Sequence, residues 1–392
     1  MRYNRLIAGL QPSRSMVTMA EAKRMQAAAP DILDLAGGEP NFATPVRVCE
    51  ELFRQVRNGY THYTVGPGLP ELRERIAQKL HEENGCRYSA DGVIVTPGAK
   101  YAIYLMTRTL VNPGDEVMYL TPAWVSYPAI IEAAGGVPVA VPLSYDTGYR
   151  ITEEALERGY SERTKLLMIN YPNNPTGRIL TEQDKCVLRA FLQRHPDLFL
   201  LSDEIYERIV YDGGQNWSPA SDEILRPRVI TVNGFSKSLA MTGWRLGYCA
   251  AAPEVAAQAG KLFQHTISCV SGFIQKAGIV ALDCQAEIES MRQIYERRRH
   301  FFVDGLNAAP GVQCIAPEGT FYAWARFQIP GMDTEQICKF LLTQAKVVGM
   351  PGIAYEETQQ PCLRFSFAAD DSVLQRAAEN IARAMRTLTG TP

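Results

Sequence analysis

The sequence lacks the marks of several protein classes. Its formal net charge is only −2, so no general attraction for nucleic acid or acidic membranes is expected. No uninterrupted apolar run is long enough to span a bilayer, and the apolar stretch Leu6–Leu10 is too short for a signal peptide. We therefore expect a cytoplasmic protein whose partners include neither nucleic acid nor a membrane.

Cysteine and histidine also lack the spacing that structural sites need. The nine cysteines are odd in number and include no CxxC pair, which argues against a disulfide framework and a zinc site. The five histidines have no metal-ligand spacing either, and we interpret them as surface or packing residues. The sequence therefore predicts a reducing compartment and no bound metal.

The chain does contain, from about residue 90 to 250, short apolar runs that alternate with longer helical stretches. This alternation predicts an α/β fold in which a mostly parallel central sheet carries helices on both faces. The predicted strands are Val93–Thr96, Glu116–Leu120, Val137–Val141, Leu166–Ile169, Leu198–Leu201, Val229–Val232 and Gly247–Ala251. The predicted helices between them are Tyr101–Thr109, Ser126–Ala134 and Glu182–Arg194.

Beyond about residue 285 the pattern predicts a smaller α+β domain. Its predicted helices are Glu287–Asn307, Thr334–Gln344 and Asp371–Thr387, and its predicted strands are Cys314–Pro317, Gly319–Phe327 and the pair Lys346–Gly349 with Cys362–Phe367. The 392 residues are too many for one simple core. We expect an N-terminal arm that packs with the small domain (residues 1–40), a large domain (41–285) and a small C-terminal domain (286–392).

Four segments that directly follow predicted strands carry unusual residues. Parallel sheets bind ligands at the carboxyl ends of their strands, where these segments lie. Thr96–Lys100 leads through a glycine into a helix, where free amides can bind an anion. Taken alone, this segment is better explained as an ordinary strand–helix turn. In Asn170–Gly177, two prolines and a glycine fix a turn that holds Asn174, whose amide can donate to a phenolic oxygen. The alternative is a loop stiffened by proline.

The third segment, Ser202–Tyr206, places Asp203 deep at the end of an apolar strand, where a carboxylate needs a cationic partner. Taken alone, a role for Asp203 as a helix N-cap is about equally well supported. Tyr206 would lie on the same face as Asp203 if the chain becomes helical here. The fourth segment, Asn233–Gly247, holds Lys237 among small and apolar neighbours that favour a reactive, uncharged amine. Arg245 follows between glycines and suits phosphate oxygens. The alternative, that Lys237 and Arg245 are two surface cations in a loop, is disfavoured because a solvated cation does not need small and apolar neighbours.

The four segments together supply a phosphate cradle, a donor to a phenolic oxygen, a partner for a pyridinium and an imine-forming lysine. Pyridoxal 5'-phosphate (PLP) needs all four at once, so we interpret the constellation as a PLP site.

Over almost its whole length the sequence resembles the class I aminotransferases of PLP fold type I, and most of all their bacterial aspartate-aminotransferase-like branch. The NNPTG motif at 173–177 and the SK…GWRLGY motif at 236–248 are specific. Supporting segments are Gly37–Phe42, Tyr60–Thr64, Gly68–Arg73, Pro122–Pro128, Pro317–Tyr322 and Leu363–Ser366.

The resemblance implies a role for each matching residue. Lys237 would form the Schiff base and move the proton, Asp203 would pair with the pyridinium nitrogen, and Tyr206 and Asn174 would bind the ring oxygen. The other residues implied at the cofactor are Gly98, Ala99, Lys100, Ser236 and Arg245, with Trp124 stacked on the ring. Arg364 would clamp the substrate α-carboxylate beside Gly38. Tyr63 would reach the phosphate of a neighbouring subunit, which implies a homodimer with shared sites.

Three of these residues could instead have a purely structural role: Trp124 as a core aromatic, Tyr63 as a turn residue and Arg364 as an outward side chain of an alternating strand. The implied activity is ping-pong amino transfer from an L-amino acid to a 2-oxo acid. Lys100 favours a dicarboxylic donor such as aspartate, with 2-oxoglutarate as acceptor, and Arg14 would add charge. It is nearly as well supported that Lys100 and Arg14 are simply solvated surface cations. The loop Pro351–Glu357 is more acidic than a site for anions suggests.

Other substrates and reactions remain open from the sequence. Alanine, aromatic amino acids, methionine and prephenate are possible substrates of the same apparatus. The same set of residues can also catalyse β-elimination, as in a C–S lyase, decarboxylation or racemisation. A ligand-sensing module attached to a DNA-binding domain is disfavoured because no helix-turn-helix segment or basic balance is present.

Overall fold

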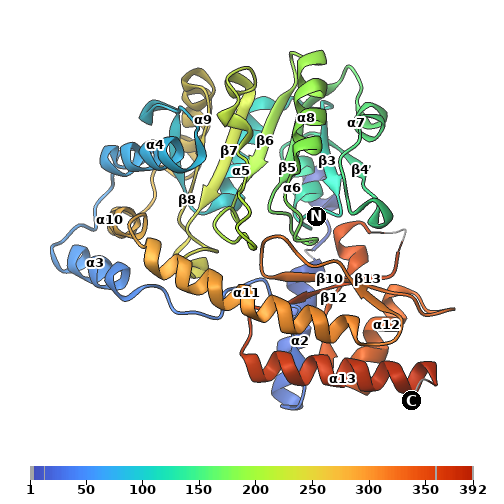
Figure 1. Ribbon diagram of the computed structural model, residues 1–392. Helices are drawn as coiled ribbons and strands as arrows, with labels where there is room; N and C mark the ends of the chain where they lie inside the picture. The colour runs from blue at the N-terminus through green and yellow to red at the C-terminus, as the bar shows by residue number, and fades with distance from the viewer. Residues whose placement is uncertain (1–3, 13, 358–359, 391–392) are drawn as a thin grey trace.

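The computed structural model describes residues 4–12, 14–357 and 360–390, and its centre is a seven-stranded sheet (Figure 1). The strand order is β2-β8-β7-β6-β5-β3-β4. Every neighbouring pair is parallel except those of β8, which runs antiparallel to β2 and β7. The strands are β2 (Val93–Thr96), β3 (Glu116–Thr121), β4 (Val137–Pro142), β5 (Thr164–Asn170), β6 (Phe199–Asp203), β7 (Val229–Gly234) and β8 (Gly247–Ala250). The predicted mostly parallel sheet is confirmed.

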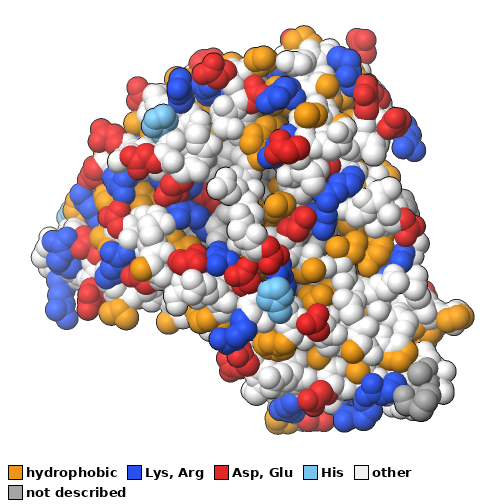
Figure 2. Space-filling model, viewed as in Figure 1, with side chains coloured by type: hydrophobic (Ala, Val, Ile, Leu, Met, Phe, Trp, Pro, Cys, Tyr) orange, Lys and Arg blue, Asp and Glu red, His pale blue; other side chains and the backbone are white. Residues whose placement is uncertain are grey.

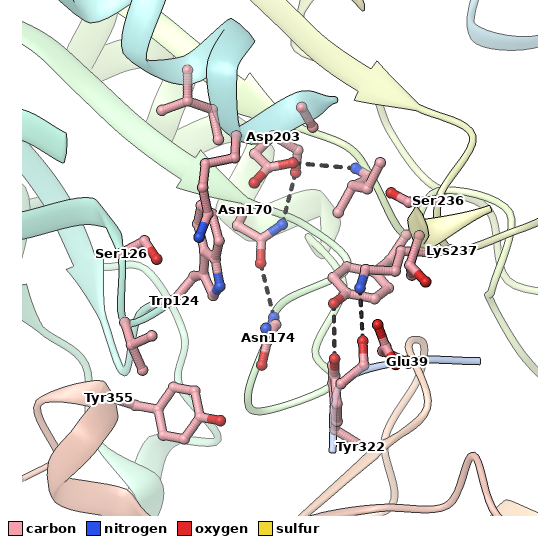
Figure 3. Close-up of a pocket in the computed structure, with 18 of the residues that line it drawn as sticks. Glu39, Trp124, Ser126, Asn170, Asn174, Asp203, Ser236, Lys237, Tyr322 and Tyr355 are labelled. Atoms are coloured by element: carbon pink, nitrogen blue, oxygen red, sulfur yellow. Dashed lines mark hydrogen bonds between the residues drawn. The ribbon is translucent and has the colours of Figure 1, made fainter. Parts of the chain in front are cut away.

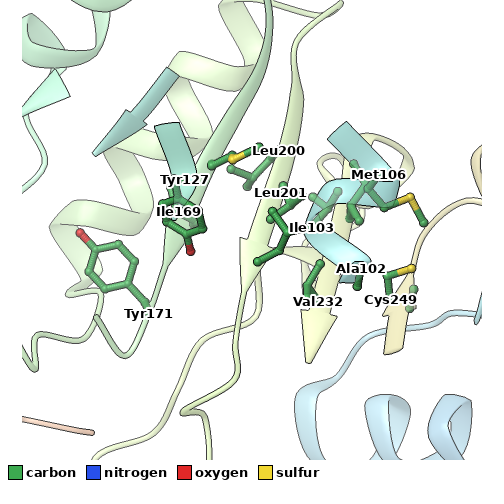
Figure 4. Close-up of a cluster of buried hydrophobic side chains, with 14 of the residues drawn as sticks. Ala102, Ile103, Met106, Tyr127, Ile169, Tyr171, Leu200, Leu201, Val232 and Cys249 are labelled. Carbon is green, nitrogen blue, oxygen red and sulfur yellow. The ribbon is translucent and has the colours of Figure 1, made fainter. Parts of the chain in front are cut away.

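Helices on both faces explain why these strands are apolar without interruption. The helices of this part are α3 (Val46–Arg57), α4 (Pro70–Asn84), α5 (Ala99–Leu110), α6 (Tyr127–Ala133), α7 (Glu153–Gly159), α8 (Glu182–Arg194), α9 (Pro253–Thr266) and α10 (Gly272–Ala281). Figure 4 shows one such contact, in which Ile103 and Met106 of α5 pack beside Leu201 of β6 and Val232 of β7. All four side chains are buried, so α5 is fixed firmly against the sheet.

A second group of elements lies below the sheet in Figure 1 and has its own hydrophobic core. Its helices are α11 (Gln285–Asn307), α12 (Thr334–Phe340) and α13 (Asp371–Thr389), and its antiparallel sheet has the order β12-β13-β10-β9. These strands are β9 (Val312–Cys314), β10 (Tyr322–Phe327), β12 (Met350–Pro351) and β13 (Cys362–Ser366). Phe302, Phe321 and Phe365 are fully buried in this core.

The N-terminal arm joins this second group through a short parallel pair. It comprises α1 (Arg5–Gly9), α2 (Arg14–Ala28) and β1 (Leu33–Asp34), and β1 pairs with β11 (Val347–Val348). Leu33 and Leu35 belong to the core of the second group. The arm therefore packs with the second group, while the division into an arm (1–40), a large domain (41–285) and a small domain (286–392) stays a prediction.

Two strand predictions for the small domain were wrong. The strand expected at Cys314–Pro317 ends at Cys314, because only Val312–Cys314 pairs with β10. The segments Lys346–Gly349 and Cys362–Phe367 do not pair with each other. β11 pairs with β1 from the far end of the chain, whereas β13 lies between β10 and β12. Pairing across such sequence distances depends on the tertiary packing and not on local pattern.

On the face of the molecule shown in Figure 2, basic and acidic side chains are interspersed. None of the helices in the described ranges is both long enough and apolar enough to cross a membrane.

Candidate active site

A cavity of about 460 Å³ lies at the carboxyl ends of β5, β6 and β7, where the small domain meets the sheet (Figure 3). Eleven of the residues predicted from the sequence line it: Gly38, Ala99, Lys100, Trp124, Asn174, Asp203, Tyr206, Ser236, Lys237, Arg245 and Arg364. The structure thus brings together residues from segments that are more than 300 positions apart in the chain, from Gly38 to Arg364.

Lys237 lies in the turn after β7 and points into this cavity. Its Nζ donates a hydrogen bond to the Gly38 carbonyl over 2.7 Å. The pKa of Lys237 is lowered to about 8, because burial disfavours the ammonium and the Arg364 guanidinium repels it. A larger fraction of this amine than of an ordinary lysine is therefore uncharged near neutral pH and can act as a nucleophile.

Asp203 ends β6 and is only 4% exposed. Burial raises its pKa to about 6, although hydrogen bonds from the Tyr127 hydroxyl and the Ile205 amide oppose this rise. Tyr127 donates to Oδ2 over 2.9 Å and Ile205 to Oδ1 over 3.3 Å, and Asn170 fixes the backbone by donating to the Asp203 carbonyl. The chain forms a turn after Asp203 and no helix, so the helix N-cap alternative is wrong. No arginine or lysine of the described residues forms a salt bridge with this carboxylate, so the site suits a cationic ligand group.

The turn between β2 and α5 forms an anion cradle with Arg245. Gly98 has φ +87°, and a Cβ there would lie 2.5 Å from Arg245 Nη2. A Cβ on Gly247 would lie 2.6 Å from the Ala99 amide nitrogen, so both glycines allow a close approach of backbones. Arg245 itself adopts φ +53°, and its guanidinium donates to the Thr242 carbonyl over 2.9 Å. The N-terminus of α5 and this guanidinium therefore face the same space, as phosphate binding requires.

Arg364 is 4% exposed although it lies in a strand where an outward side chain is usual. Every residue of β13 is buried, because the strand is covered on both faces. The guanidinium donates to Asn174 Oδ1 over 2.9 Å and to the Ala36 carbonyl over 2.8 Å, and it lies 4.0 Å from the Tyr322 ring centroid. Its Nε has no partner among the described residues, so donor capacity remains for a carboxylate.

Tyr206, Trp124 and Lys100 line the cavity with specific contacts. The Tyr206 hydroxyl shares a 3.0 Å hydrogen bond with the Tyr322 hydroxyl. Trp124 is partly buried against the core and open to the cavity, so it is not simply a core aromatic. Lys100 Nζ lies 4.9 Å from its ring centroid, and burial together with the nearby Arg245 lowers the pKa of Lys100.

Three predicted residues lie elsewhere or remain undescribed. Tyr63 is 91% exposed, away from the cavity of its own chain. Gly98 lies in the cradle turn next to Arg245 but is not among the residues that line the cavity. Arg14 begins α2, but its side chain and all of Ser13 lie outside the described residues.

The sequence reasoning assigned no role to several residues of the site, among them Glu39, Tyr127, Asn170, Tyr322 and Tyr355. Tyr127 lies three residues after Trp124, a spacing that could have suggested a shared face. Asn170 ends β5 as Asp203 ends β6, and the two are aligned in register. Tyr322 and Tyr355 come from the small domain, and no local signal in the sequence places them in the cavity.

Comparisons with known proteins agree with this site. The family model described as aminotransferase class I and II matches residues 30–381. The aspartate aminotransferase of Musicola paradisiaca is 40% identical, over 95% of this chain and 94% of its own length. The probable aspartate/prephenate aminotransferase of Aquifex aeolicus is 37% identical, over 97% of this chain and 98% of its own. The crystal structure of the aspartate aminotransferase from Rhizobium meliloti has a TM-score of 0.94 and 34% identity, covering 99% of this chain and 100% of that chain. The chain therefore belongs to the aminotransferase class I and II family and is a transaminase.

Proposed function

We propose that this transaminase uses PLP to move an amino group from a dicarboxylic L-amino acid, such as aspartate, to a 2-oxo acid, such as 2-oxoglutarate. The observation that carries the proposal is a single cavity that contains a lysine of lowered pKa and a buried carboxylate without a cationic partner. PLP offers an aldehyde to the first group and a pyridinium to the second.

The residues of the cavity fit this cofactor. Lys237 Nζ would hold it covalently, and Asp203 would pair with its ring nitrogen. The side-chain oxygen Oδ1 of Asn174 already accepts a hydrogen bond from Arg364, which leaves Nδ2 to donate to the ring oxygen together with the Tyr206 hydroxyl. Ala99, Ser236 and Arg245 would bind the phosphate, with Gly98 giving the room for it. Trp124 would stack on the ring.

The chain itself performs the proton transfer. Bound PLP supplies a protonated ring that withdraws electrons from the substrate Cα. Asp203 maintains that protonation, because burial away from other cations makes an uncompensated carboxylate costly. Lys237, once released, takes the proton from Cα as a general base and returns it as a general acid. Its lowered pKa keeps it near the operating pH for both roles. The two half-reactions share one site, so ping-pong kinetics are expected.

The choice of donor rests on two cations. Arg364 is held by Asn174 and by the Ala36 carbonyl, which presents its remaining donors to the substrate α-carboxylate beside Gly38. Lys100 lies in the same cavity and suits a distal carboxylate. The acidic loop is compatible with an anionic substrate because Glu356 and Glu357 do not line the cavity. Tyr119 donates to Glu356 over 2.6 Å and Tyr149 to Glu357 over 3.2 Å. The name of the Musicola relative supports aspartate as the donor, and that of the Aquifex relative supports prephenate as an alternative acceptor.

A homodimer with shared sites and a cytoplasmic location form part of the proposal. Tyr63 would complete the phosphate site of a second copy, which accounts for a tyrosine that is 91% exposed. Other exposed apolar side chains that a second copy could cover are Val46 at 71% and Phe53 at 62% on α3, and Val65 at 52%. The cytoplasmic location rests on the unpaired cysteines.

The proposed function can be tested by trapping the covalent bond between PLP and Lys237. Borohydride reduction of the protein after incubation with PLP is expected to fix one cofactor on Lys237, located by peptide mass spectrometry. Lys237→Ala is expected to lose both the adduct and turnover with aspartate and 2-oxoglutarate, whereas Lys261→Ala, an exposed lysine of α9, keeps both. Near-normal amino transfer by Lys237→Ala would refute the assignment.

A further inference from the structure

Tyr355 presents an unsatisfied hydroxyl to the cavity. It is the last residue of the short 3₁₀ helix Gly352–Tyr355 and is only 1% exposed, yet its hydroxyl has no hydrogen-bond partner among the described residues. The residue lines the same cavity as Lys237 and Asp203, and Figure 3 shows its hydroxyl directed inward, below Trp124 and toward Asn174.

The ring of Tyr355 is held in place on several sides. The Trp324 ring meets it edge-on at 5.6 Å between centroids and 88° between planes. The Arg364 guanidinium carbon lies 5.1 Å from its centroid. The backbone is fixed because the Tyr355 carbonyl accepts from the Ala123 amide over 3.0 Å and the next residue, Glu356, accepts from Tyr119. The hydroxyl therefore cannot turn away to find another partner.

An orphan hydroxyl in such a position is unfavourable unless a ligand satisfies it. Other buried tyrosines at this site do have partners: Tyr127 donates to Asp203, and Tyr206 and Tyr322 bond to each other. Burial raises the pKa of Tyr355, so the phenol stays protonated and can donate. The missing partner is thus a hydrogen-bond acceptor that enters the cavity.

The substrate side chain is the acceptor that fits this geometry. Tyr355 lines the same cavity as Arg364, whose guanidinium carbon lies 5.1 Å from the centre of the Tyr355 ring, and as Lys100, the proposed partner of a distal carboxylate. We propose that Tyr355 is a specificity-determining residue whose hydroxyl donates to a carboxylate or carboxamide oxygen on the substrate side chain. The inference rests on the proposed function and adds a neutral donor to the charge of Lys100.

A site built around such a donor discriminates against side chains without an acceptor, because they leave the hydroxyl unpaired. Tyr355→Phe removes the hydroxyl and keeps the ring that packs against Trp324 and Arg364. We expect kcat/KM for aspartate to fall about tenfold, the effect of one lost hydrogen bond, and kcat/KM for leucine or phenylalanine to stay unchanged or rise.

Binding without turnover gives a second readout. Calorimetry with the PLP-loaded protein is expected to show maleate, an unreactive dicarboxylate, binding about tenfold more weakly to Tyr355→Phe, with butyrate unaffected. Tyr295→Phe is the matched control, because Tyr295 is another buried tyrosine but lies outside the cavity. It should leave both ratios unchanged.

The outcomes separate the two proposals. If the wild-type protein forms the Lys237 adduct and transfers amino groups, but Tyr355→Phe affects all substrates equally or none, the role of Tyr355 is overturned and the proposed function stands. If the wild-type protein transfers no amino group from any amino acid, the proposed function fails, and maleate binding by the two tyrosine variants still tests the hydroxyl.

Discussion

Asp203 illustrates at the scale of a residue how the fold tunes a single group. Its carboxylate lies at the end of a fully buried strand, where desolvation raises its pKa, and one phenol, from Tyr127, holds the pKa below what burial alone would give. The balance leaves the group ionised at neutral pH and ready for a cation. Tyr127 is thus a positioning residue, because it acts through Asp203.

Tyr127→Phe is expected to raise the pKa of Asp203 above about 6. The carboxylate then takes up its proton at a higher pH, so the affinity of the apoprotein for PLP should begin to fall at a higher pH as the solution is acidified. The shift should be about 0.5–1 pH unit, the worth of one hydrogen bond. Fluorescence titration with PLP between pH 5 and 8 measures it.

Tyr88→Phe provides the control, because the Tyr88 hydroxyl bonds to the Val229 carbonyl and not to Asp203. An unchanged pH profile for Tyr127→Phe would show that the phenol does not govern Asp203.

The turn from β2 into α5 shows at the scale of an element why glycine is required. Gly98 combines φ +87° and ψ 161° with contact to Arg245, and α5 begins at the next residue. The positive φ of Gly98 is a constraint on backbone conformation, whereas its closeness to Arg245 is a constraint on the space that a side chain would need. Substitution therefore tests the cradle and not only the fold.

Gly98→Ala is expected to weaken PLP affinity at least about tenfold, because the new Cβ displaces the Arg245 guanidinium from the phosphate position. Backbone strain should also lower the free energy of unfolding by about 1–3 kcal/mol. Gly114→Ala is the matched control: Gly114 has φ +91° with nothing within 4 Å of an added Cβ. It should lose stability alone. Equal PLP affinity in both variants would contradict the cradle, and chemical denaturation separates the two effects.

At the scale of the whole molecule, the cavity exists because two cores face each other. The sheet supplies Asp203 and Lys237, and the small domain supplies Arg364, Tyr322 and Tyr355. The proposed dimer would add Tyr63 from a second copy. Assembly and cofactor affinity should therefore change together.

Phe53→Glu is expected to convert the proposed dimer into a monomer, because it places a charge in the exposed apolar group on α3. Light scattering measures the mass, and PLP affinity should fall because Tyr63 of the second copy is removed. Ile224→Glu changes another exposed apolar side chain, 60% exposed and outside that group, and should remain dimeric. A wild-type protein of 43.6 kDa in solution would contradict the dimer.

The sequence by itself determined the central sheet and the four motif segments of the site. Strands buried on both faces need continuous apolar runs, and the turns at Gly98 and around Asn174 need particular residues, so these features are written locally. The tertiary structure alone decided that Arg364 is buried, that β1 pairs with β11, and that Tyr322 and Tyr355 enter the cavity. Those facts depend on how the small domain packs against the sheet, and side chains brought together from distant segments leave no periodic signal in the chain.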